Sequence, residues 1–209
     1  MAGAGNRSRD RRVEIRGHAA RLFQSQGFHA TTMDDIAEAV KLNKGTLYHY
    51  YESKANLLFE ILLDTHDRRL TRIRSRPAGI SHEERVRVFI EETIMDLADH
   101  PVEGAVLFQE APFVHLWLTR DQVQVLRSRQ AEFDKFVVQA VRDGQEAGVF
   151  DGSLDSRVVT SSLVATVSWF VRWYKPGGRL SARDVAEQSS TLILRGLVVA
   201  VPARDEGGR

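Results

Sequence analysis

The sequence predicts an all-α protein, with a small N-terminal group of three helices followed by a larger helical body and about nine helices in total. Apolar residues recur three and four positions apart along the whole chain, which is the period of an amphipathic helix. A half-buried strand would appear as a run of alternating apolar and polar residues between turn residues. The sequence contains no such run. Capping and helix-breaking residues also divide the chain into helix-sized segments.

The N-terminal part contains a longer helix followed by two short ones. An apolar stripe that ends at Phe23 predicts a first helix from about Asp10 to Gln26, and Gly27 ends it. N-cap side chains then open three further helices: a threonine at 31 or 32 for a helix that ends near residue 40, Asn43 for one from Lys44 to about Tyr50, and Ser53 for a fourth.

The body contains four longer helical segments. They begin near Ser81, Asp121, Asp155 and Ser181, and an irregular, aromatic-rich segment separates the first two, after Pro101. The segment 155–174 is apolar nearly all round, so it must be covered on more than one side. Together with a last helix over 181 to about 201, it predicts a homodimer through the last two helices.

Composition removes several function classes. The 209 residues include no cysteine, which excludes disulfides, thiolate nucleophiles and cysteine-based metal sites. The seven histidines include no pair three or four residues apart, so no helical metal site is expected, and no cofactor motif appears. No apolar stretch reaches the roughly 18 residues of a membrane span, so we expect a cytoplasmic protein without a membrane partner.

Charge is divided unevenly between the two parts of the chain. Residues 1–55 carry nine Lys/Arg and six Asp/Glu, a net charge of +3, whereas the rest carries 20 and 22, a net charge of −2. A basic N-terminal part on a slightly acidic body is a weak indication of contact with nucleic acid.

The segment 31–54 is the most informative part of the sequence, and it reads TTMDDIAEAVKLNKGTLYHYYESK. A short helix that opens with Lys44, Gly45 and Thr46 presents small and basic groups to a major groove, and Gly45 permits close backbone approach. Leu47 would face inward. The segment closely resembles the DNA-binding helix-turn-helix module of the TetR family, and the resemblance covers roughly residues 11–62.

The resemblance implies double-stranded operator DNA as the partner and assigns a role to individual residues. Tyr48 and Lys54 would hold phosphates, and Thr32 would touch the DNA backbone. The residues nearest the bases would be Lys44, Thr46 and His49. Ordinary aromatic packing is the competing interpretation for the tyrosines, and it is favoured for Tyr51.

Two features near this module leave alternatives open. Lys41 stands where the family usually has glycine, a position expected at positive φ, which costs a residue with a Cβ roughly 1 kcal/mol. The basic segment 7–12 would either lie along DNA as an N-terminal arm or form a solvated tail.

Family resemblance also suggests a small-molecule effector for the body. The stretch 167–181 resembles the branch of the family that senses coenzyme A thioesters of steroid or fatty-acid breakdown, and a planar hydrophobic drug or antibiotic is the alternative effector. A mostly apolar cavity with a few polar groups is the expected site, although each residue taken alone is more simply explained as core or surface. The candidates are His66, Phe108, Glu110, Phe113, Trp117, Phe133, Trp169 and Arg172.

The sequence therefore predicts a DNA-binding regulator with a DNA-binding domain over 1–55 and an effector-binding and dimerisation domain over 56–209. The expected activity is repression that a small amphiphilic effector relieves. A helical enzyme without a recognisable motif is the principal alternative, but no residue stands out as catalytic.

Overall fold

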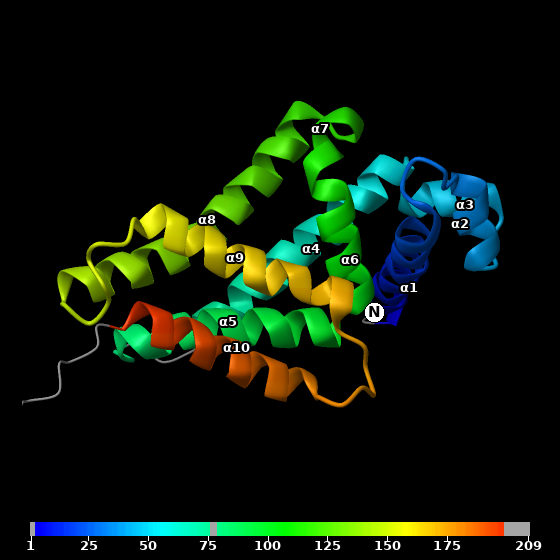
Figure 1. Ribbon diagram of the computed structural model, residues 1–209. Coiled ribbons are helices and arrows are strands. Elements are labelled where there is room, and N and C mark those ends of the chain that lie inside the picture. The colour runs from blue at the N-terminus through cyan, green and yellow to red at the C-terminus, as the bar shows by residue number, and fades with distance from the viewer. Residues whose placement is uncertain (1–2, 76–78, 199–209) are drawn as a thin grey trace, which may run out of the picture. The chain divides into compact units, whose positions relative to one another are not determined.

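The computed structural model describes residues 3–75 and 79–198, and these residues are almost entirely helical (Figure 1). The all-α prediction of about nine helices is confirmed, because the described residues form ten α-helices, of which α7 is a single turn, and one 3-10 turn. The elements are α1 (Gly3–Gln26), α2 (Met33–Ala39), α3 (Lys44–Tyr50), α4 (Lys54–Arg74), α5 (His82–Asp99), α6 (Pro101–Glu110), η1 (Ala111–Phe113), α7 (Val114–Trp117), α8 (Arg120–Glu146), α9 (Ser156–Trp173) and α10 (Ala182–Leu197).

The predicted helical segments differ from the structure in three places. The first helix begins at Gly3 and not near Asp10, so the basic segment 7–12 is helical. The segment after residue 100, expected to be irregular, forms α6, η1 and α7. Pro101 opens α6 at its first position, where a missing backbone N–H costs nothing and the fixed φ suits a helix. The last helix ends at Leu197, with Val198 as an extended C-cap, and so stops short of the predicted end near residue 201.

The chain packs as two compact units that do not follow a single cut in the sequence. The first unit consists of Met1–Arg72 and Asp96–Phe133, and the second consists of Ile73–Met95 and Asp134–Arg209. Helices α4, α5 and α8 therefore contribute residues to both units.

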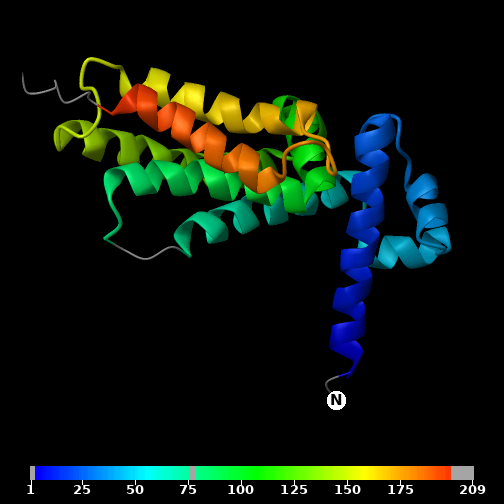
Figure 2. The same cartoon turned by 60° about the horizontal axis from the view of Figure 1, so that its bottom comes forward.

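The first unit places the short helices α2 and α3 beside α1 (Figure 2). Ile15 and Phe23 of α1 are fully buried, as are Leu57 and Leu58 of α4, and they share one hydrophobic core with Leu47 of α3. Side chains of α6 and of the start of α8 complete this core. The predicted apolar stripe of the first helix therefore faces the core that holds the short helices.

In the second unit, α9 and α10 run side by side in opposite directions (Figures 1 and 2). The backbone N–H of Asp151, before α9, donates to the carbonyl of Leu197 at the end of α10 over 2.9 Å. Helix α5 joins this pair, because the Ser190 hydroxyl of α10 donates to the Glu91 carboxylate over 2.8 Å. In the described part of the chain, no helix is long and apolar enough to cross a membrane.

Candidate nucleic-acid interface

Helix α3 presents a polar face and buries the opposite one. Leu47 is fully buried, as predicted, whereas Tyr48 is 43% exposed and Lys44, Gly45 and His49 are also exposed. The Asn43 side chain caps the helix, since its Oδ1 accepts from the backbone N–H of Thr46 over 2.8 Å. A Cβ added at Gly45 would meet only Asn43 Oδ1, at 3.5 Å. This surface therefore remains open to another molecule.

Thr32 is the N-cap of α2. Its hydroxyl oxygen accepts from the backbone N–H of Asp35 over 3.1 Å, and the Asp35 carboxylate accepts from the N–H of Thr32 over 2.8 Å. Hydrogen bonding of the Asp35 carboxylate to the backbone N–H of Thr32, and next to the Thr32 side chain, holds the pKa of Asp35 below its ordinary value. Thr32 is exposed at the start of α2, so its side chain is accessible to a phosphate.

The turn between α2 and α3 has the strained residue that the sequence predicted. Lys41 has φ 54°, and among the described residues it is the non-glycine residue with positive φ. The backbone N–H of Leu42 donates to the carbonyl of Ala37 over 2.9 Å and closes the turn. The turn thus keeps its geometry although a lysine occupies the glycine position.

A hollow of about 380 Å³ lies between α2, α3 and the start of α4. Four of the seven predicted DNA-contact residues line it, namely Thr32, Lys44, Tyr48 and Lys54. His29 also lines it, and this residue was missed because the sequence signal begins only at residue 31. The His29 ring lies 5.7 Å from the Trp117 ring, centroid to centroid, which supports it from α7.

Lys54, predicted as a phosphate ligand, binds backbone groups of the protein itself. Its ammonium donates to the backbone carbonyls of Phe28, His29 and Thr31 over 2.9, 2.9 and 2.7 Å. An ammonium has three N–H groups, so all of them are used within the protein. Partial burial lowers the pKa of Lys54, although nearby carboxylates oppose this effect.

The predicted basic arm is partly used inside the domain. An Nη of Arg11 donates to the carbonyl of Val40 over 3.0 Å, and an Nη of Arg12 donates to the carbonyl of Tyr50 over 2.8 Å. These carbonyls lie at the ends of α2 and α3, where helical partners are missing. Two consecutive arginines of α1 thus hold the ends of both short helices.

The three tyrosines of α3 and its C-cap have different environments. Tyr51 is 2% exposed and its hydroxyl donates to Glu60 over 3.0 Å, so the packing role predicted for it is confirmed. Burial, followed by the charge of Glu60, raises the pKa of Tyr51. Tyr50 packs partly buried against the core, and Tyr48 points into solvent.

The predicted effector residues are divided between the two units. Six belong to the first unit: His66, Phe108, Glu110, Phe113, Trp117 and Phe133. Trp169 and Arg172 belong to the second, where Trp169 is 62% exposed and the Arg172 guanidinium lies 5.2 Å from its ring centroid. Sequence spacing carried no signal for this separation, because these residues come from five different helices and one 3-10 turn.

Two of these residues hold the DNA-binding module. Glu110 accepts from the backbone N–H of Phe28 over 3.2 Å, and the Trp117 ring lies 5.4 Å from the Phe28 ring. Glu110 and Trp117 therefore both hold the turn after α1, and their role as ligand residues stays a prediction.

His66 is the buried polar residue with the clearest capacity for a ligand. It is 5% exposed, and its Nδ1 has no hydrogen-bond partner. Burial, followed by the charges of Arg69 and Arg129, lowers its pKa to about 4. Phe133 is buried beneath the Arg69 guanidinium, which lies 4.0 Å from its ring centroid. The described residues include no group of three potential metal ligands.

The exposed face of α3, the capped start of α2 and the hollow between them define a helix-turn-helix DNA-binding regulator. Residues 15–61 match the family model described as bacterial regulatory proteins of the tetR family, and residues 79–197 match the tetracyclin repressor-like C-terminal domain. The chain belongs to the TetR family, and it is a DNA-binding transcriptional regulator and not an enzyme.

Relatives with known names support this assignment. The chain is 30% identical over 189 residues to the transcriptional repressor KstR2 of Mycolicibacterium smegmatis, covering 90% of each chain. It is 29% identical over 187 residues to KstR2 of Rhodococcus jostii, covering 90% of this chain and 91% of that one.

Solved structures of similar proteins have the same fold. The ketosteroid transcriptional regulator KstR2 of Mycobacterium tuberculosis has a TM-score of 0.84 at 28% identity, covering 91% of this chain and 96% of that one. AibR in complex with isovaleryl coenzyme A and operator DNA has a TM-score of 0.75 at 26% identity, covering 87% and 97%.

Proposed function

We propose that the chain represses transcription by inserting α3 into the major groove of operator DNA. The observation that carries this proposal is the exposure of Lys44, Gly45, Tyr48 and His49 opposite the fully buried Leu47. Tyr48 and Thr32 contact phosphates and set position, whereas side chains of Lys44, Thr46 and His49 read base edges. In this division of labour, residues 1–55 bind DNA in the cytoplasm and residues 56–209 bind the effector and the partner subunit.

The second part of the proposal is a homodimer through α9 and α10. These two helices expose four large apolar side chains, Val158 (65%), Trp169 (62%), Trp173 (52%) and Leu192 (74%), and exposed apolar patches mark protein–protein interaction sites. Two hollows lie along α10. One of about 640 Å³ is lined by residues from Trp173 to Arg195, and one of about 440 Å³ is lined by residues that include Val158 and Leu192.

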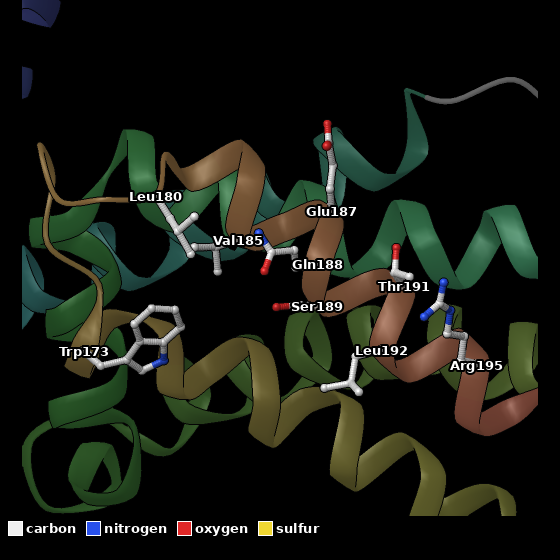
Figure 3. Close-up of a pocket in the computed structure, with 9 residues that line it drawn as sticks. All are labelled: Trp173, Leu180, Val185, Glu187, Gln188, Ser189, Thr191, Leu192 and Arg195. Atoms are coloured by element: carbon white, nitrogen blue, oxygen red, sulfur yellow. The ribbon is translucent and has the colours of Figure 1, made fainter.

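Figure 3 shows how the larger hollow is built. Trp173 and Leu180 lie at one end of it, Leu192 lies further along α10, and Thr191 and Arg195 lie at the other end. A second copy of the chain would cover this surface with the same helices, since the contact in a two-fold dimer is self-complementary. The operator is correspondingly palindromic.

The third part is an effector of amphiphilic chemistry, a coenzyme A thioester, that releases the protein from DNA. Two observations support this class. AibR, a structural relative, is described with isovaleryl coenzyme A and operator DNA, and KstR2 is described as a ketosteroid regulator. In this chain, His66 is kept neutral by burial and has an unpartnered Nδ1. A neutral imidazole offers a hydrogen bond to a carbonyl or hydroxyl without requiring a charged ligand.

The experiment has two steps. Fragments of genomic DNA that the full chain binds are first selected, which gives the operator and tests the palindrome. Release from that operator is then measured with free fatty acids, acyl-CoA esters, steroid-acid thioesters and planar drugs. Thioesters should weaken operator binding about 5- to 150-fold. Release by drugs alone would replace the thioester by the alternative effector, and no release by any class would overturn effector control.

A further inference from the structure

Phe28, in the turn that follows α1, is held by two side chains from elsewhere in the first unit. Gly27 ends α1 with φ 84°, and Phe28 follows it. The Glu110 carboxylate accepts from the backbone N–H of Phe28 over 3.2 Å. The Lys54 ammonium donates to the backbone carbonyl of the same residue over 2.9 Å. Both backbone groups of Phe28 are therefore bound by charged side chains.

The Lys54 ammonium also binds backbone carbonyls of residues that follow Phe28. Its other two hydrogen bonds go to His29 and Thr31, which lie directly before the N-cap of α2 at Thr32. One ammonium at the first residue of α4 thus fixes the path of the whole connection between α1 and α2. Because Thr32 is the N-cap of α2, the path of this connection sets where α2 starts. It thereby also sets the position of α3, the recognition helix, which follows α2.

Glu110 connects the same turn to the last residue of α6. Its side chain is 8% exposed, and the Phe28 ring that lies beside it is 3% exposed. Phe23 and Trp117 pack against that ring with centroids 5.2 and 5.4 Å away. A buried carboxylate is costly unless it accepts hydrogen bonds, so its position follows the backbone of Phe28 closely. A shift of the last turn of α6 would be transmitted to the start of α2.

We propose that Lys54 and Glu110 are positioning residues for operator binding. They act together on Phe28, and neither touches DNA. Through this pair the end of α6 sets the affinity of the helix-turn-helix for its operator. The inference requires DNA binding, which the family establishes, and it does not depend on the identity of the proposed effector.

A direct phosphate contact by Lys54 is the competing role, and the geometry disfavours it. All three ammonium N–H groups already donate to carbonyls at 2.7 to 2.9 Å. A phosphate contact would require Lys54 to give up one of these bonds, and the turn would lose part of its support at the moment when DNA binds.

The test is a double-mutant cycle in the full chain, with Lys54→Met, Glu110→Ala and the double variant. The readout is operator affinity at several salt concentrations. Each single variant should bind roughly ten-fold more weakly, and the double variant should be no more than about two-fold worse than the weaker single variant, because both act on one turn. Glu110→Gln keeps an acceptor for Phe28 and should recover most of the affinity.

Two results would overturn the proposal. One is multiplicative loss in the double variant, which independent roles would give. The other is a salt slope that falls by about 0.9 in Lys54→Met but not in Glu110→Ala, because this difference marks a lost phosphate contact. Glu103→Ala, a glutamate in the first turn of the same helix, is the matched control and should keep wild-type affinity.

A spectroscopic readout separates positioning from loss of fold. In protein labelled with 15N-phenylalanine, the Phe28 amide should shift in Glu110→Gln while amides far from the turn keep their positions. If Glu110→Ala does not fold, Glu110→Met, which fills the space but also lacks an acceptor for Phe28, replaces it in the cycle with the same expected non-additivity. An unchanged Phe28 amide in Glu110→Gln would show that the carboxylate does not hold this residue in solution, and the proposal would fail.

Discussion

The ammonium of Lys44, the first residue of the recognition helix, lies 2.9 Å from the carboxylate of Asp34 in α2. Hydrogen bonding to Asp34, followed by its charge, raises the pKa of Lys44. Both side chains are largely exposed, at 59% and 65%, so the pair adds little stability. We expect its effect on binding instead, because Asp34 competes with DNA for the Lys44 ammonium.

The first prediction concerns this pair. Asp34→Asn should increase affinity for DNA of any sequence several-fold, because it removes a negative charge beside the phosphates and frees Lys44. Gel shifts on operator and on unrelated DNA measure the change. Glu38→Gln removes the same charge from an exposed position on the same helix and should have a smaller effect. Weaker operator binding in Asp34→Asn would mean that Asp34 itself accepts from a cytosine amino group.

The second prediction separates the arginines of α1. Arg12→Met should lower the free energy of unfolding by about 1 to 3 kcal/mol, because the carbonyl of Tyr50 and the Glu60 carboxylate both lose a charged donor. Arg9 is exposed, so Arg9→Met should leave stability unchanged. Chemical denaturation measures both. If Arg9→Met lowers the salt slope of DNA binding by about 0.9, the start of α1 contacts phosphates; an unchanged slope assigns it no DNA role.

The third prediction distinguishes phosphate from base contacts on α3. Tyr48→Phe should weaken binding to all sequences equally, because it removes a hydroxyl that donates to a phosphate. Substitution of His49 or Lys44 by alanine should cost about 1 to 3 kcal/mol at one base position and relax the preference there. Binding to a library of operator variants gives both quantities. A sequence-specific loss in Tyr48→Phe would contradict the assignment.

The fourth prediction tests the dimer. Leu192 is 74% exposed in the single chain, whereas Leu197 is 7% exposed. Leu192→Asp should therefore produce folded monomers, but Leu197→Asp would bury a charge within the chain and destabilise the fold. Leu116 is also well exposed, at 59%, and lies in the other unit, so Leu116→Asp is the matched control and should remain dimeric. Light scattering at micromolar concentration measures the mass, and a monomeric wild type would end the dimer proposal.

The fifth prediction follows from the pKa of His66, which burial and the charges of Arg69 and Arg129 lower to about 4. Between pH 6.5 and 4 the unfolded chain binds a proton at this residue and the folded chain does not, so the free energy of unfolding falls as the pH falls. The full loss is on the order of 3 kcal/mol at pH 4 and vanishes above pH 6.5. Unfolding measured against pH should show a shallower dependence in His66→Gln. An identical dependence in both proteins would mean that His66 titrates normally.

The sequence predicted the features that depend on residues near one another in the chain. Leu47 is buried and Tyr48 exposed because consecutive residues of a helix lie about 100° apart around its axis, so Tyr48 falls outside the apolar stripe that contains Leu47. Asn43 caps α3 through a backbone N–H three residues away. The positive φ of Lys41 follows from the geometry of a tight turn and its place in the motif. These interactions are local, and their spacing is visible in the sequence.

Tertiary structure alone decided which distant side chains meet. Lys54 and Glu110 lie 26 and 82 residues from Phe28, and Arg12 lies 38 residues from Tyr50. No periodicity relates such positions, because their separation in space depends on how helices pack. Sequence analysis proposed DNA and an effector as the partners of Lys54 and Glu110, and it gave no sign that both side chains bind the backbone around Phe28. Their charges are bound by the backbone groups that surround Phe28, since a buried charge takes the nearest hydrogen-bonding group that the fold supplies.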